Sequence, residues 1–322
     1  MILVTGGTGF LGSTLLQYLI DDGHSVIALK RTSSVIPDPL KSSSLIQWVD
    51  AEITDYFSLE EIIPKVDQVY HCAAKVSYQK EDAAEIIKTN VEGTKHIVNL
   101  CLEHQKRLLH VSSIAALGFS KKGLAVTEKD KWEYNPKISK YSLAKHESEM
   151  EVWRGIAEGL DAVIVNPSVI MGIGWGEKGS RAIFNLVNKG NKIYPLGSVG
   201  IVDVSDVAKI MIQLMNSDIT AERYILNAEN ISNQDLLTKI SGYLQKPAPH
   251  IKATPLMLSL AWRLSKIGSL LSGKKPTLTA ESARAANSKL QYDNSKIREK
   301  LGYTFKPLDQ TLKEVCEAYY IK

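Results

Sequence analysis

The sequence predicts a mixed α/β protein whose core is a doubly wound parallel sheet with helices on both faces. The first observation is a short apolar run at residues 2–4, followed by a glycine-rich turn and then by apolar residues at helical spacing. The second is that strand patterns keep alternating with helical patterns as far as about residue 245. The third is that this alternation stops after Pro247 and Pro249, which predicts a smaller, mostly helical C-terminal lobe.

The expected elements follow from periodicity and from turn residues. Strands are expected at residues 2–4, 25–29, 45–49, 66–74, 108–113, 162–170 and 223–226. Helices are expected at residues 11–20, 82–104, 139–158 and 181–189, in segments ending near residues 62 and 215, and after the capping residue Ser232. Parallel strands joined by helices place their carboxyl ends at one edge, where such sheets bind ligands.

The turn after the first strand reads Thr5-Gly6-Gly7-Thr8-Gly9-Phe10-Leu11-Gly12. Its glycines permit a tight turn, let the backbone approach a pyrophosphate, and let the helix pack closely on the strand. The helix N-terminus adds free N–H groups and a positive dipole. An ordinary glycine-rich turn is the alternative, but the strand before and the helix after favour dinucleotide binding. The expected binding residues are Thr5, Gly6, Thr8, Gly9, Phe10, Leu11 and Gly12.

The end of the second strand carries the residues that select the cofactor. In sheets of this kind an acidic residue there binds the ribose hydroxyls of NAD, whereas a basic residue accommodates the extra phosphate of NADP. This chain has Lys30 and Arg31 at that point, and Ser33 is among the hydroxyl residues that follow. Such donors suit a phosphate dianion. A solvated basic loop is the alternative, but the position favours NADP over NAD.

Two later strands end in small or hydroxyl residues at the same edge. Ala73 and Ala74 leave room for a flat cofactor ring, and Ser112 and Ser113 end the next strand of the chain. The segment after the strand at 162–170 is a glycine-rich loop that carries Trp175, which favours a ligand-covering segment over a structural connection.

A tyrosine and a lysine at four-residue spacing, Tyr141 and Lys145, share one face of the helix expected at 139–158. The pattern alone is weak, because one chance match is expected among 13 tyrosines, and Tyr292 and Lys296 also fit it. Only the first pair lies one crossover after a strand that ends in serines, at the edge that binds ligands. We therefore interpret the first pair as functional and the second as a chance match.

These residues suit the reduction of a carbonyl group. Hydride delivery from a nicotinamide to a carbonyl carbon leaves an alkoxide that must be protonated. The Tyr141 phenol can supply that proton, and we expect the Lys145 ammonium to lower the phenol's pKa from about 10 toward the operating pH. Ser113 can donate a hydrogen bond to the developing oxyanion.

Composition narrows the function classes. With 39 basic and 35 acidic residues the net charge is +4, which is too mild to argue for nucleic acid or an anionic membrane. The first strand begins at residue 2, so we expect no signal peptide. Three cysteines without CxxC spacing predict neither a disulfide framework nor a metal site. The expected compartment is the cytoplasm.

One apolar segment, residues 255–271, raises the question of a membrane. Arg263, Lys266 and three serines make it too polar for a spanning helix. The favoured interpretation is an amphipathic helix that covers the substrate cleft or the core, and association with a membrane surface is the alternative. The side chains expected near the cleft are Leu256, Met257, Leu260, Trp262 and Leu264.

Together, the motifs resemble those of an extended short-chain dehydrogenase/reductase, the superfamily of NAD-dependent epimerases and dehydratases. In chain order they are Thr5-Gly6-x-x-Gly9-x-x-Gly12, His71-x-Ala73-Ala74, Asn90-Val-x-Gly-Thr, Ser112-Ser113, Tyr141-x-x-x-Lys145, Asn166-Pro167-Ser168 and Val202-Asp-Val-x-Asp206-Val-Ala. The branch that they resemble is the dihydroflavonol-reductase-like and hydroxysteroid-dehydrogenase-like one, through Lys30-Arg31, Asn166-Pro167-Ser168, Tyr224-Ile-Leu-Asn-Ala-Glu and Tyr292-Asp-Asn-Ser-Lys296.

This resemblance implies roles for individual residues. Tyr141 matches the catalytic acid/base, Lys145 its partner that also holds the nicotinamide ribose, and Ser113 the serine that binds the substrate oxygen. Further cofactor-binding residues expected are Glu52, Ile53, Ala73, Ala74, Lys75, Asn90, Pro167 and Ser168, and the substrate residues expected are Val76, Tyr78, Ser113, Ile114 and Trp175. Glu52 stands where the superfamily usually has an aspartate beside the adenine, and Asn166 stands where sugar-nucleotide enzymes often have arginine.

The resulting interpretation is an NADP-dependent carbonyl reductase or alcohol dehydrogenase acting on a small, apolar aldehyde or ketone. Residues 1–166 and 197–227 are expected to form the Rossmann-type cofactor domain, and residues 167–196 and 228–322 the substrate lobe. The expected partner is the small-molecule carbonyl substrate; a homodimer is compatible with the sequence.

Two other functions stay open. An epimerase with bound NAD must hold a sugar diphosphate with arginines, and the segment 167–207 offers only Arg181 and a few lysines. Against this, Lys178, Arg223, Arg263 and Lys266 could still converge in space. A dehydratase is excluded, because Ser113-Ile114-Ala115 stands where those enzymes have Thr-Asp-Glu. A non-catalytic NADP-binding protein is the third reading.

Overall fold

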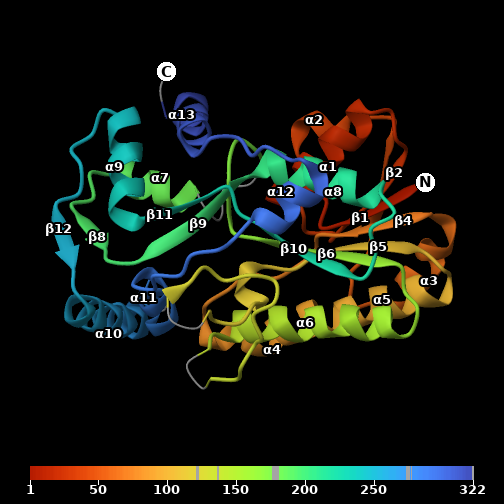
Figure 1. Cartoon of the computed structure of the whole chain (residues 1–322), viewed down its shortest axis with the longest axis horizontal. Coiled ribbons are helices and arrows are strands. Elements are labelled where there is room, and N and C mark those ends of the chain that lie inside the picture. Colours follow the sequence, from red (N-terminus) through yellow and green to blue (C-terminus); the bar gives the residue numbers. More distant parts are fainter. Residues whose placement is uncertain (121–122, 136–137, 176–180, 273–275, 277, 321–322) are drawn as a thin grey trace.

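The computed structural model describes the chain except residues 121–122, 136–137, 176–180, 273–275, 277 and 321–322. Within the described residues, the centre is a parallel sheet of seven strands (Figure 1). In order across the sheet these are β10 (Glu222–Leu226), β6 (Ala162–Pro167), β5 (Arg107–Val111), β4 (Gln68–His71), β1 (Ile2–Thr5), β2 (Val26–Lys30) and β3 (Ile46–Asp50). The strand order reverses between β1 and β4, as in a Rossmann-type sheet, which confirms the predicted fold class.

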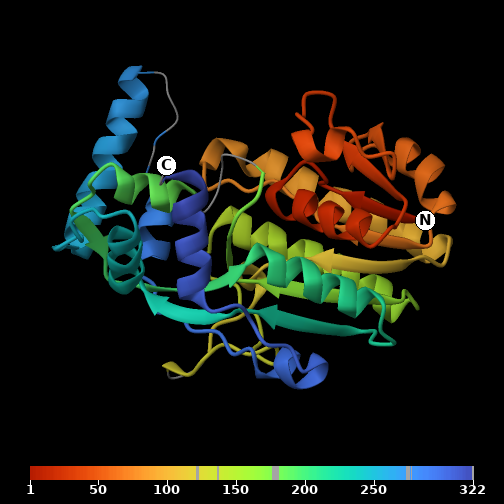
Figure 2. The same ribbon diagram turned by 90° about the horizontal axis from the view of Figure 1, so that it is seen from above.

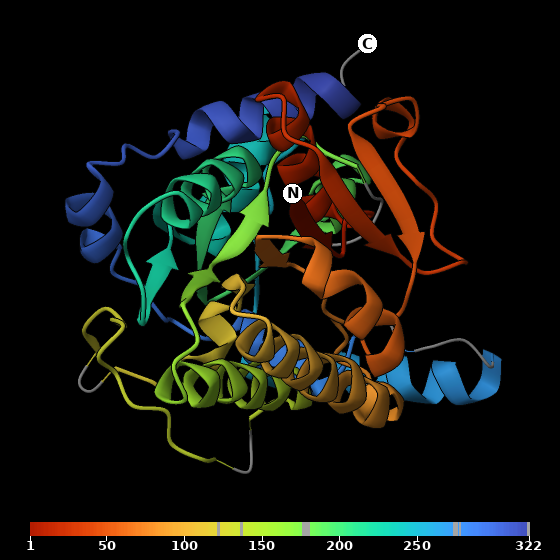
Figure 3. The same cartoon turned by 90° about the vertical axis from the view of Figure 1, so that its right-hand side faces the viewer.

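Helices cover both faces of this sheet (Figures 1 and 3). One face carries α1 (Phe10–Asp21) and α8 (Val204–Met215), and the other carries α3 (Tyr56–Ile62), α5 (Gly93–Glu103) and α6 (Lys140–Ala157). Successive side chains of a strand point to opposite faces, so Ile2 and Val4 join the core under α1 and α8, whereas Leu3 joins the core under α5 and α6. Burial on both faces explains why β1, β2 and β6 are almost continuous apolar runs.

The helix expected at 82–104 is continuous but changes its winding. It begins as α4 (Ala83–Ile87), passes through a π-helical turn at Lys88–Glu92, and continues as α5. Such widened turns occur often at functional sites, and this one contains Asn90. The remaining short helical pieces of this half are α2 (Asp38–Lys41) and the 3-10 turns Ile63–Lys65, Lys80–Asp82 and Ile114–Ala116.

A smaller part of the molecule has its own sheets and core. Its strands are β7 (Val169–Met171), β9 (Ser198–Asp203) and β11 (Glu229–Ser232) in one sheet, and β8 (Ile193–Pro195) and β12 (Ile251–Ala253) in another. Its helices α7 (Arg181–Asn188), α9 (Asn233–Tyr243) and α13 (Leu308–Tyr319) pack on this core. The single strand expected at 162–170 is wrong, because the chain changes sheets at Ser168 between β6 and β7. The expected cap is confirmed: the Ser232 hydroxyl accepts a hydrogen bond of 3.0 Å from the Asp235 N–H.

The rest of the C-terminal part consists of α10 (Pro255–Ser272), α11 (Ala280–Ala286) and α12 (Ser295–Leu301). The apolar segment at 255–271 is a helix, as expected, but its predicted place is wrong. Leu256, Leu260 and Leu264 are 71%, 54% and 67% exposed, and none of them reaches the cavity described below. Among the described helices, none is long and apolar enough to cross a membrane.

Candidate active site

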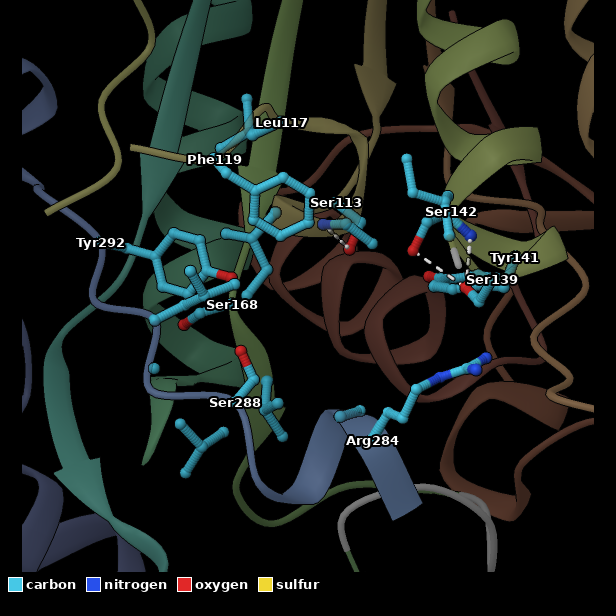
Figure 4. A pocket seen from close by; sticks show the side chains of 18 of the residues that line it. Ser113, Leu117, Phe119, Ser139, Tyr141, Ser142, Ser168, Arg284, Ser288 and Tyr292 are labelled. Carbon is cyan, nitrogen blue, oxygen red and sulfur yellow. Dashed lines mark hydrogen bonds between the residues drawn. The ribbon is translucent and has the colours of Figure 1, made fainter. Parts of the chain in front are cut away.

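A cavity of about 480 Å³ opens beside the carboxyl ends of β5 and β6 (Figure 4). Much of its wall is apolar and includes Val76, Ile114, Leu117, Phe119, Trp132 and Leu290. Its polar lining includes Ser113, Tyr141, Ser168, Glu281, Arg284 and Tyr292. The ends of the parallel strands and α11 with the segment after it therefore enclose one space, at the edge where this type of sheet binds ligands.

Ser113 and Tyr141 meet in this cavity. Ser113 follows β5 and caps the short turn after it, where its hydroxyl accepts a hydrogen bond of 3.1 Å from the Ala115 N–H. Tyr141 lies in the first turn of α6, 8% exposed. Burial raises the pKa of the Tyr141 phenol and the nearby Tyr78 adds to the rise, while a hydrogen bond with Ser113 opposes it. The phenol is therefore a neutral acid across the ordinary pH range.

Lys145 lies one turn further along α6 and is also buried. Its Nζ donates a hydrogen bond of 2.8 Å to the Val111 carbonyl at the end of β5. Burial lowers the pKa of Lys145 to about 8, and the Glu149 carboxylate limits that fall. The net direction of the shift at Tyr141 differs from the expected one, because burial dominates and raises the pKa of the Tyr141 phenol instead of bringing it toward the operating pH.

A buried polar network behind the cavity was not anticipated from the sequence. Its centre is Glu149, whose carboxylate is completely buried. This carboxylate accepts hydrogen bonds of 2.6 Å from the Ser112 hydroxyl and 2.7 Å from the Asn166 amide. It also forms an ion pair of 2.8 Å with Arg223 of β10. The network thus ties α6 to the ends of β5 and β6 and to the neighbouring strand β10.

The sequence did contain a signal for this network. Tyr141, Lys145 and Glu149 recur at every fourth residue, so they lie along one face of α6. Asn166 makes a second contact, a hydrogen bond of 3.0 Å from its amide to the Ser113 carbonyl. The position that distinguishes this chain from the sugar-nucleotide enzymes therefore supports the backbone of the predicted catalytic serine.

The glycine turn between β1 and α1 forms a close-packed cradle. Gly6 has φ of +70°, and a side chain there would also meet the backbone of Ala73 at 2.8 Å. A Cβ at Gly12 would lie 2.2 Å from the Gly6 carbonyl oxygen. Helix α1 has Gly9 as its N-cap, with no side-chain cap and no acidic residue in its first turn. Its N-terminal N–H groups and its dipole are therefore available to a pyrophosphate, which fits a dinucleotide cofactor.

Two other predicted cofactor residues hold loops in place. The Thr5 hydroxyl lies 2.8 Å from His71 Nδ1 and accepts a hydrogen bond of 3.1 Å from the Ala73 N–H. The Asn90 side chain accepts a hydrogen bond of 2.7 Å from the Lys75 N–H and donates one of 3.1 Å to its carbonyl. The segment after β4 is therefore fixed beside the glycine turn by side chains from β1 and from the π-helical turn.

Of the two cations at the end of β2, Lys30 is paired within the described part of the chain and Arg31 is not. Lys30 pairs with Asp50 at the end of the adjacent strand β3. Arg31 is exposed and forms no ion pair with any described residue, and Ser33 nearby is exposed as well. The structure thus separates two side chains that the sequence analysis treated as equivalent.

The other predicted cofactor residues surround the same region. Thr8 is half-buried in the glycine turn, Phe10 begins α1 beside Gly174, and Leu11 is buried. Ile53 is buried where Gly93 leaves it room, because a Cβ at Gly93 would lie 2.7 Å from the Ile53 side chain, whereas Glu52 is exposed. Ala74 is exposed and Ala73 and Lys75 are half-buried, all after β4. Pro167 ends β6, and the buried hydroxyl of Ser168 beside it has no partner among the described residues.

Four of the predicted substrate residues line the cavity, namely Val76, Tyr78, Ser113 and Ile114. The Tyr78 ring packs against that of Tyr141 with a centroid separation of 5.7 Å. The fifth, Trp175, is exposed and does not line this cavity, and much of the glycine-rich loop that follows it lies outside the described residues.

The second tyrosine–lysine pair does not form a second site, but its tyrosine belongs to the first one. Tyr292 lines the cavity, and burial raises its pKa to about 12. Lys296 points elsewhere, pairs with Glu222 and lies 4.6 Å from the centre of the Tyr224 ring. Sequence reasoning also missed Arg284 and Glu281, because nothing in the spacing of a short helix shows that it faces the cavity.

The geometry and the sequence motifs agree with one known family. The chain matches the NAD dependent epimerase/dehydratase family over residues 2–227. The chain belongs to this family. It is accordingly an enzyme of the extended short-chain dehydrogenase/reductase type, whose members bind a nicotinamide cofactor, and the resemblance drawn from the motifs is confirmed.

Relatives within the NAD dependent epimerase/dehydratase family include reductases. A putative dihydroflavonol 4-reductase from Synechocystis is 32% identical over 320 residues, which cover 96% of this chain and 91% of that protein. Sterol demethylase protein B from Methylococcus capsulatus is 27% identical over 93% of this chain and 92% of that protein. The crystal structure of gox2253 is 26% identical, with a TM-score of 0.84, and covers 100% of this chain and 99% of that one. The similarity therefore spans the cofactor sheet and the C-terminal part alike.

Proposed function

We propose that this enzyme is an NADP-dependent oxidoreductase that reduces the aldehyde or ketone group of a small, apolar substrate to an alcohol. The observation that carries this proposal is that Ser113 and Tyr141 both line one cavity with a largely apolar wall. Hydroxyl donors at one end of an apolar cavity suit a substrate whose single polar group is the reacting carbonyl.

The chain's own residues account for the proton half of the reaction. A bound nicotinamide supplies the hydride that forms the new C–H bond. The Ser113 hydroxyl donates a hydrogen bond to the carbonyl oxygen, and Tyr141 transfers its phenolic proton to the oxygen as the C=O double bond opens. The Lys145 cation favours the phenolate that results, which then regains its proton from water. In this proposal the Ser168 hydroxyl, which has no partner among the described residues, and the Lys145 ammonium would hold the nicotinamide end of the cofactor.

The preference for NADP rests on Arg31. Its exposed guanidinium follows β2, where this type of fold contacts the adenosine ribose, and no described residue forms an ion pair with it. Lys30 contributes less because its ammonium is paired with Asp50. No carboxylate follows β2 to bind the ribose hydroxyls of NAD.

The described cations that could favour an epimerase either have other partners or lie away from the cavity. Arg223 pairs with Glu149, and Arg181 lies over the Tyr319 ring at 3.9 Å. Arg263 and Lys266 are on α10 and do not line the cavity, while Lys178 lies outside the described residues. Arg284 is the one described cation in the cavity lining, and a single arginine is a poor match for a sugar diphosphate.

We also propose that residues 1–166 and 197–227 hold the cofactor and that residues 167–196 and 228–322 shape the substrate cavity. Strand β9 pairs with β7 and β11, so the first residues of the segment 197–227 also belong to the smaller sheet. The cytoplasm remains our proposed compartment, because Cys72, Cys101 and Cys316 are free thiols.

A panel of apolar aldehydes and ketones, read by NADPH consumption, tests the function. We expect turnover with NADPH and no binding of sugar nucleotides by calorimetry. Micromolar binding of a UDP- or dTDP-sugar without reduction of any carbonyl would instead identify an epimerase. Tight NADPH binding with neither activity would identify a non-catalytic cofactor-binding protein.

A further inference from the structure

Helix α10 carries an apolar face that nothing in the described structure covers. Leu256, Leu260, Leu264 and Ile267 are each more than half exposed, and their spacing places them along one face of the helix. Met257 extends this face and is 39% exposed. Figure 2 shows α10 projecting from the C-terminal part, away from the large sheet. Contiguous exposed side chains of this size mark an interaction surface rather than ordinary surface scatter.

The stretch of sequence that contains this face is basic. From residue 236 to residue 280 the sequence contains seven lysine and arginine residues and no aspartate or glutamate. The whole chain has 39 basic and 35 acidic residues, so the rest of it is net acidic. Arg263 and Lys266 are exposed on α10 beside the apolar face, and Lys252 is exposed just before the helix. An amphipathic helix with cations bordering leucines is typical of proteins that lie on anionic lipid surfaces.

The side chain of Arg263 is arranged in a way that suits an interface. Its guanidinium lies 4.8 Å from the centre of the Trp262 ring and donates a hydrogen bond of 2.8 Å to the Ser259 carbonyl. A cation held beside an aromatic ring at the border of an apolar stripe matches the order of groups across a lipid headgroup region. Helix α10 also packs against α11, which contributes Glu281 and Arg284 to the cavity.

We propose that α10 docks the enzyme on an anionic lipid surface, with Leu256, Leu260, Leu264 and Ile267 entering the headgroup boundary, while the basic side chains of Lys252, Arg263 and Lys266 contact acidic headgroups. The docking itself does not depend on the reaction that the enzyme catalyses. If the proposed function holds as well, docking places a cavity with an apolar wall one helix away from the membrane that dissolves apolar carbonyl compounds.

Sedimentation with lipid vesicles tests this proposal. The wild-type protein should bind vesicles of phosphatidylcholine mixed with phosphatidylglycerol, and binding should weaken in about 1 M salt, where the Debye length is about 3 Å. Binding to pure phosphatidylcholine should be much weaker. The double variant Leu260→Glu/Leu264→Glu should lose at least about tenfold in partitioning to the anionic vesicles.

A matched control separates the helix from a general charge effect. The variant Phe57→Glu/Leu186→Glu makes the same charge change at two exposed apolar side chains of α3 and α7 and should bind vesicles nearly as the wild type does. Equal losses in the two double variants, or no binding by the wild type, would overturn the proposal. A wild-type dimer that the α10 variant converts to a monomer, without vesicle binding, would assign the face to a second copy instead.

The docking proposal and the proposed function are distinguished by measuring how fast the variant Leu260→Glu/Leu264→Glu turns over a water-soluble carbonyl compound. Normal turnover together with lost vesicle binding would support docking and leave the proposed function standing. Vesicle binding without any carbonyl turnover would support docking and count against the proposed function alone.

Discussion

The guanidinium of Arg223 lies 2.8 Å from the carboxylate of Glu149, which is completely buried one helical turn beyond Lys145. This ion pair connects the last strand of the large sheet to the helix that carries the predicted catalytic tyrosine and lysine. Removing one member of a buried ion pair leaves an uncompensated charge, which costs far more than the intact pair contributes.

We therefore predict that Arg223→Gln lowers the free energy of unfolding by about 3–5 kcal/mol. The double variant Glu149→Gln/Arg223→Gln should recover part of that loss, because the remaining neutral groups still form hydrogen bonds. Urea unfolding measures both. The exposed pair of Lys239 with Asp309 is the control, and Lys239→Gln should cost less than about 1 kcal/mol. Equal losses of unfolding free energy in Arg223→Gln and Lys239→Gln would contradict a larger stabilising role for the buried pair.

Tyr141 and Tyr292 line the same cavity but should respond differently to loss of the hydroxyl. Tyr141→Phe removes the transferable proton, so turnover should fall by at least about a hundredfold while NADPH affinity stays nearly unchanged. Tyr292→Phe should change KM by a few fold and leave kcat close to the wild type, because this residue lines the cavity without Lys145 beside it. Steady-state kinetics with one carbonyl substrate distinguish them, and a similar loss of kcat in both variants would refute the assignment.

The pH profile of reduction should report Lys145. Its pKa is lowered to about 8 by burial, so the cation is present below that pH and is lost above it. Because the pKa of Tyr141 is raised, the phenol remains protonated and the upper limb of kcat/KM belongs to Lys145. We expect kcat/KM to fall as pH rises through about 8. A profile that is flat to pH 10 would contradict this.

The same profile tests whether Glu149 acts through Lys145. The carboxylate raises the pKa of Lys145 against the effect of burial. Glu149→Gln should therefore move the upper limb to lower pH, in addition to any loss of stability. A destabilised variant whose upper limb has not moved would assign Glu149 a structural role only.

Cofactor choice should depend on Arg31 more than on Lys30. NADPH should bind at least about tenfold more tightly than NADH, a difference of roughly 1.4 kcal/mol. Arg31→Asp should reverse the preference, because a carboxylate repels the extra phosphate and accepts hydrogen bonds from ribose hydroxyls. Lys30→Ala should have the smaller effect, since that ammonium is paired with Asp50. Fluorescence titration with the two cofactors provides the affinities, and equal affinities in the wild type would refute the assignment.

The large sheet was predictable because most of its strands contain a short apolar run and alternate along the chain with helical patterns. The glycine turn, Ser113, Tyr141 and Lys145 could be placed for the same reason, since they lie at ends of strands or at helical spacing. The apolar pattern of 162–170 is interrupted by Asn166, Pro167 and Ser168, but this interruption does not show that the chain leaves the large sheet there and enters a second one.

The substrate side was harder to predict because its residues meet only through tertiary packing. Arg284 and Tyr292 line the cavity from segments about 150 residues after Tyr141. The spacing of residues within each segment does not indicate that these segments meet. The position of α10 could not be predicted, because an apolar stripe on a helix indicates burial but does not identify the surface that covers it. The net charge of +4 does not reveal the basic segment around α10, because it is the sum of that segment and of a remainder that is net acidic.

The central claim is that this chain transfers hydride to a carbonyl carbon while Tyr141 supplies the proton. Mass spectrometry of the product formed from deuterated NADPH and an apolar aldehyde tests it most directly. The account predicts an alcohol that carries deuterium on the former carbonyl carbon, formed at least about a hundredfold more slowly by Tyr141→Phe. NADPH that binds tightly but transfers no deuterium to any aldehyde or ketone would contradict it.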